Sequence, residues 1–219
     1  MILDKVSIGT KRGILPHMQK ICAKIKEHLI FLQQFVLHPT EVSAVMRTSE
    51  ALSRLLVEKA NITQAESIVE LGPGTGAATT IINQQRRPSS KFMAIEINRN
   101  LIDQLSKKCP DTIIVHAPAE DLLMYLRQEH IPSVDAIVSG LPWSSFKIST
   151  QNRLLDVIEQ ALAPGGRFVT IAYPQGLLLP TGQAFRRALR QRFMNVHASR
   201  IVWENIPPGF VYEAEKSRT

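Results

Sequence analysis

A basic chain of 219 residues with a formal net charge of +7 and a hydrophobic fraction of 44% is long enough for one domain with a substantial core, which excludes disorder as the default. Its two cysteines, Cys22 and Cys109, are far apart and exclude a disulfide framework, which fits a reducing, cytoplasmic location. Neither a signal peptide in residues 1–16 nor a membrane span in residues 29–37 is expected, because the first lacks an apolar core and the second is short and contains two glutamines.

Residues 16–38 have the pattern of a basic amphipathic helix. Apolar side chains recur at steps of three and four, whereas the lysines fall mostly elsewhere, and Pro39 ends the pattern. Such a helix can lie in a membrane interface with its lysines on anionic headgroups. It can equally dock its apolar stripe on the core, and periodicity does not separate these alternatives. A second helix is expected to begin after a cap at Thr48 or Ser49 and to run through Lys59.

After Asn61, predicted strands and helices alternate. Strands are expected near 67–71, 92–97, 112–116, 134–139 and 167–173, and helices near 77–86, 99–108, 120–129 and 150–162, with residues 162–166 as a helix stop and tight turn. A helix near 182–192 precedes an antiparallel pair of strands near 196–204 and 209–214 at the sheet edge. This order predicts an α/β fold with a mostly parallel seven-stranded sheet, covered by helices on both faces, and with ligands at the carboxyl ends of the strands.

The first predicted strand leads into a glycine-rich loop, Glu70-Leu71-Gly72-Pro73-Gly74-Thr75-Gly76, and then into a helix. Glycine permits positive φ and close approach of the backbone to a ligand, and the helix N-terminus offers free N–H groups. A dinucleotide fingerprint would require G-x-G-x-x-G. The observed pattern instead resembles motif I of the class I S-adenosylmethionine (SAM) methyltransferases, E/D-x-G-x-G-x-G. SAM has no pyrophosphate, so it needs a close backbone for its amino acid part and a carboxylate for its ribose.

This resemblance implies further cofactor contacts at the ends of the next strands. Glu96 ends the second strand, where the family uses an acid to hold the ribose hydroxyls. At the third strand end many relatives read G-D-A, but Pro118 stands in place of the acid, so Ala119, Glu120 or Asp121 must make that contact. Asp121 can equally be only a helix-start residue. The expected SAM-binding set is Glu70, Gly72, Pro73, Gly74, Thr75, Gly76, Glu96, Ile97, Ala119, Glu120 and Ser139.

The fourth strand ends in Ser139-Gly140-Leu141-Pro142-Trp143. Amino-group methyltransferases often read N-L-P-Y here, where the amide and a proline carbonyl hold the target nitrogen and the aromatic ring stacks on a planar base. Gly140 stands in place of the Asn, so an adenine would lose one of its two holders. Trp143 can stack on a base, pack around a methylated ammonium by cation–π attraction, or be purely structural. Leu141, Pro142 and Trp143 are therefore expected to position the substrate.

A proton acceptor for the substrate amine is harder to identify from the sequence. Glu120, Asp121, Tyr173 and His197 are the candidates, and none has a spacing that singles it out. We prefer Tyr173, because it ends a core strand beside the fourth strand end, where ligands should lie.

Together with residues 162–166 and the Pro-Pro segment 205–209, these motifs resemble bacterial phospholipid N-methyltransferases, which methylate phosphatidylethanolamine, and their ornithine-lipid relatives. The likeness runs from about Phe31 to Tyr212. More distantly, the chain is similar to ribosomal RNA adenine dimethylases. The resemblance implies a Rossmann-like class I methyltransferase fold in residues 61–219. Residues 1–60 would add the amphipathic helix and a helical segment that covers the cofactor.

The basic charge is concentrated in two flanks. Residues 1–28 carry six basic and two acidic side chains, and residues 181–203 carry five arginines and no acid. Anionic membrane surfaces and nucleic acid are the partners that such flanks fit, and a solvated face without a partner is the third reading.

We therefore predict an enzyme that transfers methyl groups from SAM to the amine of phosphatidylethanolamine or ornithine lipid. It would be cytoplasmic and bound peripherally to the membrane through the N-terminal helix and the segment with Arg186, Arg187, Arg190 and Arg192. An RNA or DNA adenine N6-methyltransferase is the first alternative. A SAM-binding adaptor without activity is the second.

Overall fold

The computed structural model describes residues 48–218 of the chain. The helix predicted over residues 16–38 lies outside these residues. Among those described, no helix combines the length and the apolar character needed to cross a membrane.

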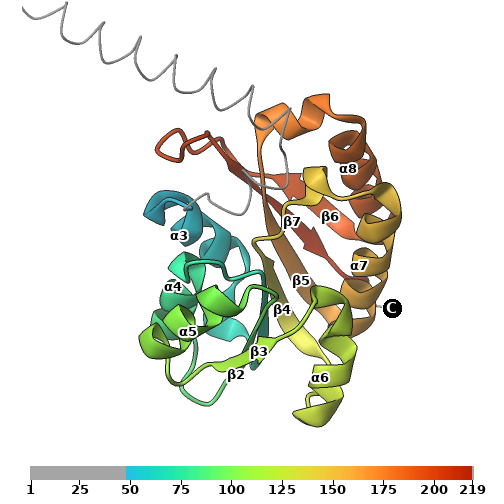
Figure 1. Ribbon diagram of the computed structural model, residues 1–219. Coiled ribbons are helices and arrows are strands. Elements are labelled where there is room, and N and C mark those ends of the chain that lie inside the picture. The colour runs from blue at the N-terminus through green and yellow to red at the C-terminus, as the bar shows by residue number, and fades with distance from the viewer. Residues whose placement is uncertain (1–47, 219) are drawn as a thin grey trace, which may run out of the picture.

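One sheet of seven strands organises the described residues, in the order β3-β2-β1-β4-β5-β7-β6 (Figure 1). The strands are β1 Ser67–Leu71, β2 Lys91–Glu96, β3 Ile113–His116, β4 Val134–Ser139, β5 Leu162–Ala172, β6 Met194–Ala198 and β7 Phe210–Glu215. The first five are parallel, whereas β7 is antiparallel to both of its neighbours. The predicted α/β fold with an antiparallel C-terminal pair is confirmed.

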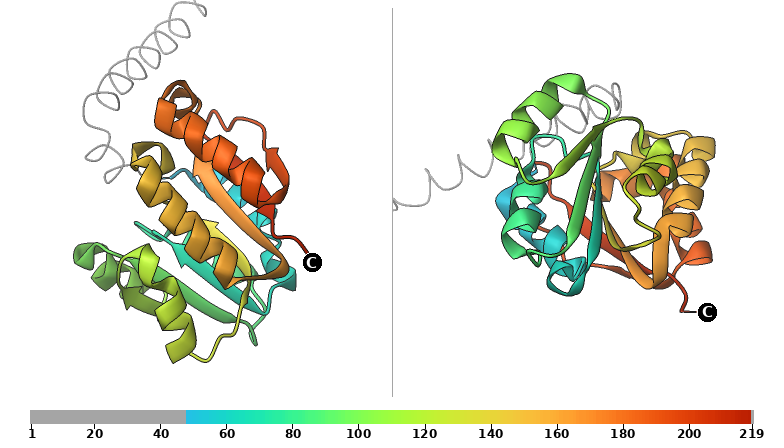
Figure 2. Two further views of the ribbon diagram at one scale, coloured as in Figure 1. Left: turned by 90° about the vertical axis from the view of Figure 1, so that its right-hand side faces the viewer. Right: turned by 90° about the horizontal axis from the view of Figure 1, so that it is seen from below.

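Helices cover both faces of this sheet. They are α3 Glu50–Lys59, α4 Ala77–Gln85, α5 Arg99–Lys108, α6 Leu122–Gln128, α7 Ile148–Ala161 and α8 Pro180–Arg192, with short 3-10 turns η1 Ile62–Gln64, η2 Ala119–Asp121, η3 Trp143–Ser145 and η4 Pro174–Leu178. Helices α3, α4 and α5 lie on one face and α6, α7 and α8 on the other (Figures 1 and 2). The central strands are mostly apolar, as expected for strands buried on both faces, and two apolar clusters result, one on each face.

The segment 162–166 differs from its prediction. Strand β5 begins at Leu162, directly after α7, and the register to β4 shifts between Val134 and Ala136. Gly165, at φ +75°, donates its N–H to the carbonyl of Lys216 (3.1 Å), so the glycines form an irregularity inside the strand instead of a turn before it. The sixth strand is also shorter than predicted. It ends at Ala198, and residues 199–209 form a loop that returns to β7.

The C-terminal loop is tied to the start of α3. Ser49 caps that helix, as predicted, with its hydroxyl accepting from Leu52 N (3.3 Å). The Ser49 N–H in turn donates to Oδ1 of Asn205 (2.7 Å), a fully buried residue of the loop. Two segments 156 residues apart therefore meet at the carboxyl edge of the sheet.

Candidate cofactor and acceptor sites

The glycine-rich loop follows β1 and leads into α4. Gly72, Gly74 and Gly76 all have positive φ. At Gly72 (φ +69°) a side chain is also excluded by space, because a β-carbon would come 2.9 Å from Cδ2 of Leu141. The N–H of Gly72 donates to Ile95 O (2.9 Å), which holds the loop to the end of β2. The backbone of the glycine-rich loop is therefore held in place and is not covered by side chains at its glycines, so a ligand can approach it closely.

Glu96, at the end of β2, holds this loop through its carboxylate. Oε2 accepts from Gly74 N (3.0 Å) and Oε1 from Asn98 N (2.9 Å). The residue is 6% exposed and lines the adjoining cavity. Because a carboxylate oxygen has two acceptor positions, each oxygen keeps one for a ligand hydroxyl. This geometry suits a cis-diol such as the ribose of SAM.

Glu70, at the end of β1, is a buried acid beside the same cavity. Its Oε2 has no hydrogen-bond partner among the described residues. The pKa of Glu70 is raised to about 7, chiefly by burial; the Thr79 hydroxyl opposes this shift and the nearby Glu96 charge adds to it. A buried carboxyl without a partner is costly, and a cationic ligand would relieve that cost. SAM carries both an ammonium and a sulfonium, so the residues present fit it.

The cavity has a volume of about 340 Å³. This is in the range of small-molecule sites. Of the predicted SAM-binding residues it is lined by Glu70, Gly72, Pro73, Gly74, Thr75, Glu96 and Ile97. Sequence reasoning missed Thr48, Ser53, Leu56, Ala77, Ala78, Asn98, Leu101, Phe146 and Ile171. Asn98 had a local signal, since it caps α5 just after the acid, but the residues of α3 reach the cavity only through the tertiary fold.

Four predicted cofactor residues do not line this cavity. Gly76 is the N-cap of α4, and Ala119 lies in η2. Glu120 faces Arg153 instead (3.9 Å). The hydroxyl of Ser139 is fully buried and accepts from Trp143 Nε1 (3.2 Å) and Leu141 N (3.3 Å), so it serves the fold. A contact from these residues to the cofactor stays a prediction.

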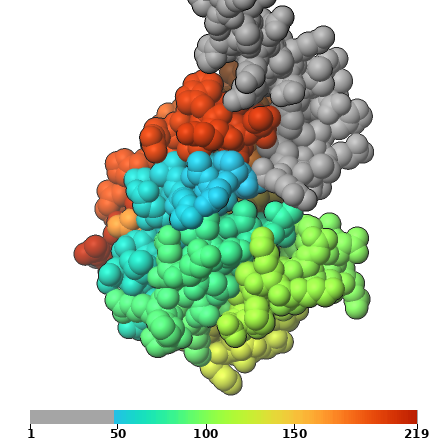
Figure 3. Space-filling model, turned by 90° about the vertical axis from the view of Figure 1, so that its left-hand side faces the viewer, coloured from blue at the N-terminus to red at the C-terminus, as the bar shows by residue number. Residues whose placement is uncertain are grey.

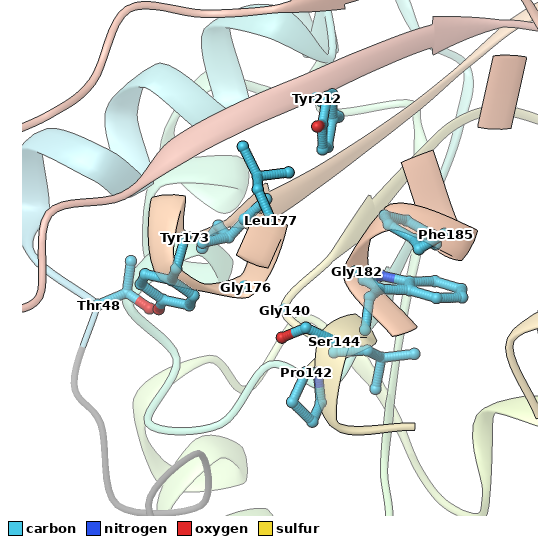
Figure 4. Close-up of a pocket in the computed structure, with 14 residues that line it drawn as sticks. Thr48, Gly140, Pro142, Ser144, Tyr173, Gly176, Leu177, Gly182, Phe185 and Tyr212 are labelled. Carbon is cyan, nitrogen blue, oxygen red and sulfur yellow. The ribbon is translucent and has the colours of Figure 1, made fainter. Parts of the chain in front are cut away.

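A second, smaller cavity of about 70 Å³ adjoins the first. The two share Thr48, Gly140, Leu141, Pro142 and Ile171 as a common border. Thr48 and Tyr173 lie on one side of the smaller cavity, and Gly182 and Phe185 on the other (Figure 4). Its walls are mostly apolar and aromatic. A small polar group placed here would lie next to the larger cavity, which is the arrangement that group transfer requires.

Trp143 is a core residue in this structure. It is 3% exposed, its ring stacks on Phe185 (centroids 4.4 Å apart, planes at 16°), and its edges meet Phe146 and Phe168. Its Nε1 donates to Ser139 Oγ. One face of the ring is therefore occupied by Phe185, and the ring forms part of the cavity wall. A role of Trp143 in positioning the substrate stays a prediction.

Tyr173 lines the smaller cavity at the end of β5, as predicted. Burial raises its pKa to about 12, and Asn205 only partly opposes the shift. The side chain is therefore a neutral phenol at neutral pH, and a role in accepting or relaying the amine proton stays a prediction. The other candidates, Glu120, Asp121 and His197, do not line this cavity, and none of the described residues that do carries a carboxylate or an imidazole.

The arginines of α8 divide into two groups. Arg192 pairs with Asp156 and, at 3.4 Å, with Glu159, so it stabilises the packing of α8 on α7. Arg186, Arg187 and Arg190 line a surface groove of about 450 Å³, and within residues 48–218 no carboxylate lies at ion-pair distance from them. Burial raises the pKa of Tyr212, and the charges of Arg186 and Arg190 oppose the shift. Tyr212 and Leu177 line the smaller cavity, so the groove adjoins it.

Comparison with known sequences gives two kinds of relative. The family model of ribosomal RNA adenine dimethylases matches residues 47–123. An ornithine lipid N-methyltransferase of Singulisphaera acidiphila is 29% identical over 77% of this chain and 100% of its own length. An rRNA adenine N-6-methyltransferase of Bacillus licheniformis is 30% identical over 41% of this chain, and the match spans only 29% of that protein.

Solved structures support the fold. TrmN from Thermus thermophilus has a TM-score of 0.64 and 20% identity over 80% of this chain and 51% of its own. The O-methyltransferase TomG from Streptomyces achromogenes, in complex with SAM, has a TM-score of 0.60 and 15% identity over 87% and 89% of the two chains. The rRNA family model ends before β4, whereas a match over 77% of the chain must extend beyond residue 123. The likeness to the rRNA family model therefore stops before the acceptor segment.

Proposed function

We propose that this chain, which is an S-adenosylmethionine-dependent methyltransferase, methylates the primary amine of a membrane lipid headgroup, phosphatidylethanolamine or ornithine lipid. Gly140 is the residue that favours a lipid amine over an adenine as the methyl acceptor. A β-carbon at this position would come 2.5 Å from the carbonyl oxygen of Gly72, so the side-chain amide that helps to hold an adenine does not fit here without movement of the glycine-rich loop. The similarity to an ornithine lipid N-methyltransferase over that protein's whole length supports the same choice.

In this proposal the larger cavity holds SAM. Glu96 would accept from the ribose hydroxyls, the bare backbone at Gly72 would allow close approach, and the unpaired oxygen of Glu70 would face the positive charge. The sulfonium supplies an already activated methyl group, so no covalent intermediate with the protein is needed. The protein's contribution is to align the acceptor and to exclude water.

The smaller cavity would receive the acceptor amine. Its border with the larger cavity is formed by Gly140, Leu141 and Pro142, which places an amine there beside the cofactor. Apolar walls disfavour an ammonium ion, so entry favours the neutral amine and leaves its proton in solvent. The phenol of Tyr173 can accept a hydrogen bond from the amine and orient it. Desolvation would therefore replace a general base.

Peripheral membrane binding completes the proposal. Arg186, Arg187 and Arg190 are exposed and unpaired within the described residues, and each contributes about 1 kcal/mol near an anionic surface. Sedimentation with vesicles tests this point. Binding that is indifferent to anionic lipid and to salt would remove the electrostatic part of the proposal.

An adenine N6-methyltransferase acting on RNA is the second candidate. The match of residues 47–123 to the rRNA adenine dimethylase model favours it, and the arginine groove would then track phosphates. Gly140 and the occupied face of Trp143 speak against it. A SAM-binding adaptor without activity is the third reading.

The deciding experiment is incubation with methyl-labelled SAM and, separately, phosphatidylethanolamine, ornithine lipid and ribosomal RNA. We expect label in a lipid amine. We expect no label when phosphatidylcholine is the added acceptor, because it offers no primary amine. Label in RNA alone would overturn the lipid proposal. SAM binding without label in any acceptor would favour the adaptor.

A further inference from the structure

The loop between β6 and β7, residues 199–209, presents apolar side chains to solvent. Ile201 is 38% exposed, Trp203 70% and Ile206 47%. A single exposed apolar residue needs no explanation, but three within six residues, including an indole, form a patch. We call these three residues the apolar tip.

The loop that carries the apolar tip is held in place by its inward residues. Val202 and Gly209 exchange backbone hydrogen bonds (2.7 and 3.2 Å). Asn205 is fully buried, donates Nδ2 to Pro207 O (2.7 Å) and accepts from Ser49 N (2.7 Å). Because Val202 and Asn205 point inward, the residues between and beside them point outward. In Figure 3 the surface of residues near 200 lies directly against that of α3. The apolar tip is therefore exposed on a fixed base and not on a loose loop.

The apolar tip lies at the edge of the sheet where the two cavities open. Strand β7 runs antiparallel to β5, and its first residue, Phe210, pairs with Ala172, the last residue of β5. A β-carbon on Gly209 would lie 3.4 Å from the ring of Tyr173, which lines the smaller cavity. The turn η4, which begins directly after Tyr173, presents Leu178, which is 77% exposed and follows the cavity residue Leu177. Exposed apolar side chains therefore come from two segments that adjoin residues of the acceptor cavity.

Positive charge accompanies these side chains. The loop itself is neutral, since Arg200 and Glu204 balance, but Arg186, Arg187 and Arg190 line a groove that shares Leu177 with the acceptor cavity. Trp prefers the boundary between headgroups and acyl chains, and arginines beside it meet anionic phosphates. This combination fits an anionic lipid surface.

We propose that the apolar tip and Leu178 insert into the interfacial layer of an anionic membrane and hold the acceptor cavity against it. A lipid amine could then enter the cavity while its acyl chains stay in the bilayer. This inference rests on the proposed lipid substrate. It adds a contact that is independent of charge and separate from the predicted N-terminal helix.

Two tryptophans make the test direct, because Trp143 is 3% exposed and Trp203 is 70% exposed. The full chain is mixed with vesicles of phosphatidylethanolamine and phosphatidylglycerol, with and without brominated acyl chains. We expect a blue shift of the emission and quenching by the brominated chains. Both signals should vanish in Trp203→Phe, which keeps an apolar ring and removes the indole. Trp203→Ala should lower vesicle partitioning by roughly tenfold, the loss of one aromatic side chain buried at the interface. Met124→Ala removes an apolar side chain that is 43% exposed on α6 and should change nothing.

Activity separates this inference from the proposed function. Trp203→Ala should lower lipid methylation on vesicles by a similar factor and leave it unchanged on the same lipid dispersed in detergent. Vesicles that bind the protein without any change in Trp203 emission would overturn the inference. A change in oligomeric state on Trp203→Ala, without a change in lipid binding, would identify the apolar tip as a protein interface and overturn it as well. Absence of lipid methylation in detergent would instead overturn the proposed function.

Discussion

Gly140 and Gly72 are in direct backbone contact at the carboxyl edge of the sheet. A β-carbon on Gly140 would come 2.5 Å from the Gly72 carbonyl oxygen, and the Gly140 N–H donates to Leu71 O (2.9 Å). The loop that would bind SAM and the segment that would bind the acceptor are therefore one packed unit. Glycine replaces the Asn of the N-L-P-Y pattern at position 140 because a side chain there would clash with the Gly72 carbonyl.

Replacing Gly140 with Asn tests this contact. We expect Gly140→Asn to displace the glycine-rich loop, to lower the free energy of unfolding by about 1–3 kcal/mol and to weaken SAM binding. Urea unfolding and titration calorimetry measure the two effects. Gly165→Ala is the control, because it strains a positive φ (+75°) in β5 at a residue that lines neither cavity, and it should cost stability without changing SAM affinity. Full SAM affinity in Gly140→Asn, together with activity on RNA, would favour the adenine reading.

Glu96 should dominate cofactor affinity. Both of its oxygens accept backbone N–H groups, so the amide of Glu96→Gln would place an NH₂ against one of them. Hydrogen bonds to a charged group contribute about 1.5–3 kcal/mol, so we expect SAM affinity to fall by about 10- to 100-fold. Calorimetry measures this, with the exposed acid Glu66→Gln as a control. An unchanged dissociation constant would mean that Glu96 only holds the loops.

Most helices and strands could be predicted from local sequence patterns. The predictions failed where contacts between residues far apart in the chain determine the structure. The strand–glycine–helix unit and Glu96 are local in sequence and were predicted correctly as structure. The segment 162–166 was not, because Gly165 bonds to Lys216, far away in the chain. The contact of Asn205 with Ser49 spans 156 residues and has no local signature. Burial of Trp143 depends on Phe185 from α8, so the sequence left its role open.

The buried acid Glu70 should make stability depend on pH. In the folded chain its pKa is raised to about 7 from an unfolded value of 4.5, so the folded state binds more protons between these values. The contribution of Glu70 is therefore full below pH 4.5 and is lost as pH rises through 7. Relative to Glu70→Gln, we expect the wild-type free energy of unfolding to fall by about 2.5 kcal/mol between pH 5 and pH 8. Urea unfolding at several pH values measures the difference. The exposed Glu129→Gln should show no such trend, and parallel curves for wild type and Glu70→Gln would refute the prediction.

Tyr173 should orient the acceptor and not titrate. Because its pKa is raised to about 12, loss of the hydroxyl in Tyr173→Phe removes one neutral hydrogen bond. We expect kcat/KM for the amine to fall by about 2- to 10-fold, with an unchanged pH profile around neutrality. Loss of a general base would instead cost about 10²- to 10⁴-fold and change the profile. Steady-state kinetics against pH distinguish the two, with Tyr125→Phe on α6 as the matched control.

The two tryptophans should behave in opposite ways on unfolding. Trp143 is 3% exposed and packs on Phe185, so Trp143→Ala should cost about 3–5 kcal/mol. Trp143→Phe keeps most of the volume and loses the hydrogen bond to Ser139, which contributes about 1 kcal/mol. Trp203→Ala, at a site 70% exposed, should stay within about 0.5 kcal/mol of wild type. Urea unfolding ranks the three variants. If Trp143→Ala unfolded like wild type but raised KM for the acceptor, the ring would be a substrate platform and not a core residue.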